Sequence, residues 1–192
     1  MTRATTSAPK VPEGASKHDC NLMMRRLLLE RFQLKAHVEN REVAVYELRV
    51  GKGGPKIAPV SPDSKAILTE ANLHQEHPDM PIPSPDLLQG GVLRTFERGH
   101  AWIVISKQPL QRFTDSLYST VERPVFDRTG LPGIYSFVLS WTPGRPSADL
   151  GAEIGPSVFT AIQQQLGLKL ESAKANIDIL VVESALKVPT EN

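Results

Sequence analysis

The same order of local patterns occurs near both ends of the chain: a helical pattern followed by two β-rich runs. The first helix is predicted from about Asp19 to Phe32, and "LKAHVE" and "VAVYELRV" follow it. The last helix is predicted within "GPSVFTAIQQQL", and "GLKLES" and "IDILVVES" follow it. An ungapped alignment places Phe32 on Leu166 and Leu34 on Leu168. The shared order and the shared Leu-Lys step indicate an internal repeat, so we expect a fold built from copies of an α-β-β unit.

A longer variant of this unit is predicted in the middle of the chain. "AWIVIS" has the apolar run of a buried strand, and Pro109 opens a helix with one apolar stripe. "RPVFDRTGLPGIYSFVLSW" then predicts strand, turn and strand, with Asp127 as a turn-forming residue. The fold class is therefore α+β: repeated α-β-β units that form antiparallel or mixed sheets, with the helices packed on one face.

Glycine, proline and small polar residues separate these units. The start of the chain is rich in Thr, Ser, Ala and Pro, and four prolines occur between positions 78 and 85. We expect a disordered leader at 1–17, a first α-β-β unit at 18–50, a Gly/Pro-rich insertion loop at 51–90, a middle β-α-β-β unit at 91–142, a linker at 143–155 and a last α-β-β unit at 156–192.

Charge and hydropathy exclude several classes of partner. Lys and Arg total 22 against 21 Asp and Glu, so the chain has no strong positive field and we expect no nucleic-acid partner. No apolar run approaches the ~20 residues that cross a bilayer, which predicts no transmembrane segment. The N-terminus has no apolar signal-peptide region, so the chain as given is expected in the cytoplasm. Cys20 is the single cysteine, which rules out an intrachain disulfide.

The stretch "HQEHPD" is the candidate metal site. It places His74, His77 and Asp79 close together, and imidazole and carboxylate groups bind divalent metals. Calcium or another divalent ion is the expected cofactor if the site is real, since carboxylate oxygens suit calcium. The spacing differs from established metal-hydrolase motifs, so a solvated polar loop is the alternative.

Aromatic residues form the candidate substrate site. Tyr135 and Phe137 lie on one face of a strand with alternating pattern, and Trp102 is in a neighbouring strand. These three side chains could line a pocket for an acyl chain; ordinary core packing is the alternative.

The stretch "GKGGPK" at 51–56 is rich in glycine and lysine, as phosphate-binding loops are. It lacks the spacing of a P-loop and follows a strand without opening a helix. The sequence therefore favours a structural role, the exit from a hairpin.

Three blocks carry a family resemblance: "LLLERFQLKAHVENREVAVYELRVGKGGPKI", "RPVFDRTGLPGIYSFVLSWTP" and "GPSVFTAIQQQLGLKLESAKANIDILVVESALKVPTEN". Over residues 18–192 the chain resembles a large family of soil-associated proteins, abundant in acidobacteria and also found as an extension of BlaR1-type membrane peptidases. Members are usually longer at the N-terminus and carry an export signal, so the resemblance implies an extracytoplasmic location.

Two functions are implied by this resemblance. Soil-metagenome relatives are associated with hydrolysis of N-acyl-homoserine lactones, a quorum-quenching activity with suggested calcium dependence and a small acyl lactone as substrate. Alternatively, the repeats are similar to the α/β modules of secretin-type periplasmic domains, which bind protein partners and assemble rather than catalyse. The matching blocks identify no catalytic residue.

Overall fold

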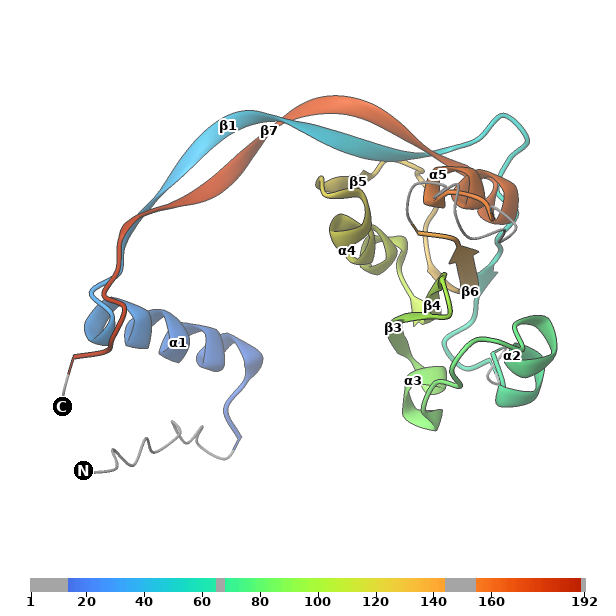
Figure 1. The fold of residues 1–192 in the computed structure, drawn as a ribbon, viewed down its shortest axis with the longest axis horizontal. Helices are drawn as coiled ribbons and strands as arrows, with labels where there is room; N and C mark the ends of the chain where they lie inside the picture. The colour runs from blue at the N-terminus through green and yellow to red at the C-terminus, as the bar shows by residue number, and fades with distance from the viewer. Residues whose placement is uncertain (1–13, 65–67, 144–154, 191–192) are drawn as a thin grey trace. The chain divides into compact units, whose positions relative to one another are not determined.

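The computed structural model describes residues 14–64, 68–143 and 155–190. Contacts divide the chain into two compact units, Met1–Glu42 with Asn176–Asn192 and Val43–Ala175, which we call the terminal unit and the central unit. β1 (Lys35–Val50) and β7 (Leu168–Ser184) are neighbours in one sheet, and each contributes residues to both units (Figure 1). Most of the predicted leader and linker, positions 1–13 and 144–154, lies outside the described residues.

The terminal unit contains the predicted first helix, α1 (Lys17–Arg31). Ser16 Oγ accepts a hydrogen bond from the Asp19 N–H at 3.2 Å, and the Asp19 carboxylate accepts from the Ser16 N–H at 3.0 Å, which forms a capping box. At the other end, the N–H of Thr190 donates to the Arg31 carbonyl at 2.8 Å. Both ends of α1 therefore have partners for backbone groups that a helix leaves open.

Each pair of short strands predicted after the repeated helices is in fact one long strand, which corrects the α-β-β units to helix-plus-strand units. The reason is local: neither "NRE" at 40–42 nor "AKAN" at 173–176 contains Gly or Pro, so nothing reverses the chain there. The alignment that places Leu34 on Leu168 also places Val50 on Ser184, and these two residues end β1 and β7. The structure thus supports the repeat while changing its unit.

β1 lies between β5 (Val125–Asp127) and β7 in a three-stranded sheet. It pairs in parallel with β5, where Tyr46 is opposite Val125. Side-chain contacts show that β1 runs antiparallel to β7. His37 near the start of β1 contacts Glu183 near the end of β7, and Arg49 near the end of β1 contacts Glu171 near the start of β7. This sheet is mixed, as predicted.

The central unit also has a four-stranded antiparallel sheet in the order β2-β6-β4-β3. Its strands are β2 (Pro59–Val60), β3 (Gly91–Glu97), β4 (His100–Gln108) and β6 (Ile134–Trp141). Buried and half-buried residues alternate along β6 without a break, which confirms the predicted half-buried strand.

Helices cover both faces of this sheet, although the sequence predicted one face. α4 (Leu110–Val121), and α5 (Val158–Ala161) with its continuation as the π-helix η1 (Ile162–Leu166), pack with Ile103 and Leu139 in the main core. α2 (Glu70–Glu76) and α3 (Pro85–Gln89) pack with Trp102 in a second core.

The predicted insertion loop at 51–90 is therefore not a loop. It contributes β2, α2 and α3, because Leu73, Met80 and Leu88 in it supply the apolar contacts that bury the second face. The α+β class is confirmed.

Candidate functional site

The residues of "HQEHPD" lie at the end of α2. His74 is in its last turn, and His77 caps the helix with its N–H donating to the Leu73 carbonyl at 2.8 Å. Asp79 lies beyond the helix, and its carboxylate is 3.8 Å from the Arg98 guanidinium. The stretch predicted as irregular is thus half helical.

These side chains do not form a metal site among the described residues. Nowhere within 14–64, 68–143 and 155–190 are three or more His, Cys, Asp or Glu side chains grouped so as to hold a metal ion. His74, His77 and Asp79 are thus not grouped as ligands in the described residues, and the calcium or other divalent ion that the resemblance implies stays a prediction.

His77 instead lines a pocket of about 550 Å³ in the central unit. We call it the α2 pocket; it is lined by the segment 56–60, by Leu73 and His77 from α2 and its cap, by Phe137 of β6 and by Gln165 of η1. Its volume lies in the range of small-molecule sites, and it combines apolar side chains with a few polar groups, as such sites do.

Two of the polar side chains on the lining, Gln165 and His77, differ in how firmly they are held. Gln165 makes two hydrogen bonds to Ser140 of β6: its Nε2 donates to the carbonyl at 2.7 Å, and its Oε1 accepts from the N–H at 3.0 Å. Burial lowers the pKa of His77 below its ordinary 6.5, and the nearby Glu76 carboxylate partly offsets this. His77 is therefore neutral at pH 7, a form that accepts a proton.

Sequence reasoning missed Gln165 and the segment 56–60 as parts of this pocket. The segment was assigned to a loop, although its apolar run "IAPV" was a usable strand signal. Nothing in "AIQQQL" distinguishes a π-helix from an α-helix, so the direction of Gln165 had no sequence signal.

The three aromatic candidates do not share one pocket. Phe137 lines the α2 pocket, whereas Trp102 lines a different pocket of about 470 Å³ together with Arg94 and Trp141. Tyr135 is 2% exposed in the main core, and its hydroxyl donates to the Pro132 carbonyl at 2.9 Å. The core alternative thus describes Tyr135 better than the predicted acyl-binding role.

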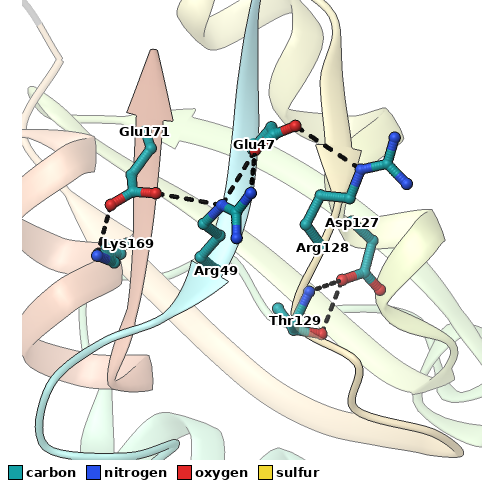
Figure 2. A network of polar contacts seen from close by, with 7 residues as sticks. All are labelled: Glu47, Arg49, Asp127, Arg128, Thr129, Lys169 and Glu171. Carbon is teal, nitrogen blue, oxygen red and sulfur yellow. Dashed lines mark hydrogen bonds and ion pairs between the residues drawn. The ribbon is translucent and has the colours of Figure 1, made fainter. Parts of the chain in front are cut away.

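Charged side chains on β1, on β7 and just after β5 form a network (Figure 2). Glu47 contacts both Arg49 and Arg128, and Arg49 also contacts Glu171. Hydrogen bonding to Glu47 raises the pKa of Arg49, and hydrogen bonding to Lys169 lowers the pKa of Glu171. Both shifts favour the charged form of the group, so we assign the network to sheet structure rather than chemistry.

The Asp127 carboxylate lies beside this network and accepts hydrogen bonds from the Thr129 N–H and hydroxyl, at 2.9 and 2.7 Å. This geometry confirms its predicted role in a turn.

Comparison with known proteins gives a family but no activity. The sequence matches the family described as Protein of unknown function (DUF3738) over residues 3–185. No curated protein and no solved structure matches the chain. Across the part that the structure describes, no helix is both long and apolar enough to cross a membrane.

Proposed function

The chain belongs to the DUF3738 family, whose function is unknown, and on that premise we propose that it is a hydrolase that opens the ring of N-acyl-homoserine lactones in the α2 pocket. The proposed activity rests on the resemblance of the sequence to soil-associated relatives that are associated with hydrolysis of these lactones. The observation that carries the site is that His77 and Phe137, singled out separately in the sequence, line the same pocket.

The pocket matches the two chemical parts of such a substrate. An acyl chain would contact Leu73, Phe137 and Leu166, which are apolar and line the pocket. The lactone ring would lie near His77, which is half-buried and neutral at pH 7. The side-chain amide of Gln165 is hydrogen-bonded to the backbone of Ser140, so the role of Gln165 is to shape the pocket.

The reaction assigned to this site is addition of water to an ester. The water oxygen bonds to the lactone carbonyl carbon, and a proton passes from water to the neutral imidazole of His77. The ring C–O bond then breaks, and the proton returns to the leaving ring oxygen. The product is the open hydroxy acid, and the imidazole ends neutral, as it began.

The experiment measures ring opening by mass, so that hydrolysis is distinguished from sequestration. His77→Gln keeps a polar side chain but cannot accept the proton, and we expect kcat/KM to fall by roughly 10²–10⁴-fold. His74→Gln is the matched control, because His74 is exposed, lies on the same helix and does not line the pocket. Its activity should stay within about twofold of wild type.

The same assay is repeated with the chelator EDTA and with added calcium. If both histidine variants lose activity equally and EDTA stops wild type, the metal-loop prediction replaces the proposed pocket chemistry. If wild type never exceeds one equivalent of product, the hydrolase proposal is wrong.

A second candidate is a non-catalytic binding and assembly module located outside the cytoplasm. It is favoured by large apolar side chains that the terminal unit exposes: Leu22, Met23, Met24 and Leu29 of α1, Val38 of β1, Leu180 and Val182 of β7, and Leu186 and Val188 after β7. Exposed apolar surface of this kind favours protein contacts.

The module proposal predicts association that depends on concentration. Sedimentation of wild type should show larger species as protein concentration rises, and Met24→Glu should abolish them. If the wild-type protein stays monomeric at all concentrations and also turns over lactone in the hydrolase assay, the module proposal is contradicted.

A further inference from the structure

A second polar pocket lies where the loop after β1 meets the start of β7. The N–H of Gly51 donates to the Gly167 carbonyl at 2.9 Å, and the N–H of Lys56 donates to the Leu166 carbonyl at 2.8 Å. A Cβ on Gly167 would be 2.2 Å from the Gly54 carbonyl oxygen. Glycine therefore permits two backbone segments to touch at a distance that any side chain would prevent.

The close approach of these two segments brings lysine side chains to one pocket. A pocket of about 370 Å³, which we call the lysine pocket, is lined by Gly51–Gly54, Lys56, Gln163, Gly167 and Lys169. Lys52, Lys56 and Lys169 are thus brought together from separate parts of the sequence, and the lining includes no carboxylate. A cluster of lysines with no balancing acid on the lining attracts anions.

The three lysines differ in the hydrogen bonds and ion pairs that their ammonium groups make. Lys56 Nζ donates to the Gln164 carbonyl at 2.7 Å, and Lys169 pairs with Glu171. Lys52 is exposed and has no partner among the described residues. Both Lys52 and Gly53 also have backbone N–H groups without an acceptor within the described ranges. The residues that line the pocket therefore include, within the described ranges, a free ammonium group and two free backbone donors.

We propose that the lysine pocket binds a phosphate group. A phosphate dianion carries three acceptor oxygens and can use ammonium groups and backbone N–H donors together, whereas a monocarboxylate has half the charge. The pocket volume exceeds that of a bare phosphate, so a phosphate monoester fits as well as inorganic phosphate. This inference does not depend on the proposed hydrolase activity.

The test is a titration of the full chain, labelled with nitrogen-15, with inorganic phosphate at constant ionic strength. We expect saturable shifts confined to the amide signals of the pocket lining, with the largest at Lys52 and Gly53, whose backbone N–H groups are free. Lys52→Gln should weaken binding by roughly tenfold, the loss of one charge-assisted contact. Lys187→Gln is the matched control, because Lys187 is exposed and lies outside the pocket; its affinity should equal that of wild type.

Two further arms identify the ligand. Glycerol 3-phosphate that binds tighter than inorganic phosphate indicates a phosphate ester, and equal affinity indicates free phosphate. Three results would overturn the proposal. Acetate at the same ionic strength could bind as well as phosphate, or phosphate could give no saturable shift up to about 50 mM, which corresponds to a binding free energy weaker than roughly 2 kcal/mol. The third is that Lys52→Gln and Lys187→Gln bind phosphate equally well.

Discussion

Gly167 occupies a tight backbone position in the central unit, and its substitution by alanine tests how that unit is held together. The residue ends η1 with a φ of +68°, a conformation that costs an L-residue roughly 1–2 kcal/mol. The added Cβ would also lie 2.2 Å from the Gly54 carbonyl oxygen and 2.8 Å from the Lys56 nitrogen. Because both are backbone atoms, the loop 51–56 must move away.

That movement weakens two backbone hydrogen bonds, Gly51 to Gly167 and Lys56 to Leu166. Each contributes about 0.5–1.5 kcal/mol net. Together with the conformational cost, Gly167→Ala should lower the free energy of unfolding of the central unit by about 3 kcal/mol. That is a large fraction of the roughly 5–15 kcal/mol by which a domain is stable.

The assay is urea unfolding followed by tryptophan fluorescence. Trp102 and Trp141 are the two tryptophans of the chain, and both are buried in the central unit, so the signal reports on that unit. Gly53→Ala is the matched control: a Cβ there would meet no atom within 4 Å, and Gly53 does not have a positive φ. Equal unfolding free energies for the two variants would refute the close-approach argument.

Two further predictions concern a titrating group and a side-chain contact. Hydrogen bonds to Glu39 and Glu183 raise the pKa of His37, so its contribution to stability is complete below the ordinary pKa of 6.5 and is lost as pH rises through the higher folded value. NMR titration should give an imidazole pKa above 6.5, and a value at or below 6.5 would contradict these contacts. Gln165→Ala removes both hydrogen bonds to Ser140 and should cost about 1–3 kcal/mol in the same urea assay; a change under about 0.5 kcal/mol would show that these bonds add nothing net.

Local patterns predicted the elements whose signals are strong. The apolar stripe of α4 and the alternation in β6 both specify a buried face, and the structure has both elements with those faces buried. The capping box at Ser16 and Asp19 could be anticipated, since it depends on residues three apart. The α+β class follows from such elements.

What depends on distant contacts could not be predicted. The length of β1 is set by pairing with β7, which lies more than a hundred residues away in the sequence, so its own sequence suggested two strands. α2 is short and mostly polar, and it is buried through Leu73 against β4 and β6. For the same reason, the sequence could nominate His77 and Phe137 separately but could not show that they line one pocket.

The most direct test of the central claim is to fill the α2 pocket and measure kcat/KM for lactone opening. Ala58 is exposed and lines the pocket, so Ala58→Trp should block it without disturbing either core. Ala71 is exposed on α2 but does not line the pocket, which makes Ala71→Trp the matched control. The account predicts that Ala58→Trp lowers kcat/KM by about tenfold or more, equivalent to about 1.4 kcal/mol, while Ala71→Trp stays near wild type. Equal activity of the two variants would contradict the claim that substrate binds in the α2 pocket.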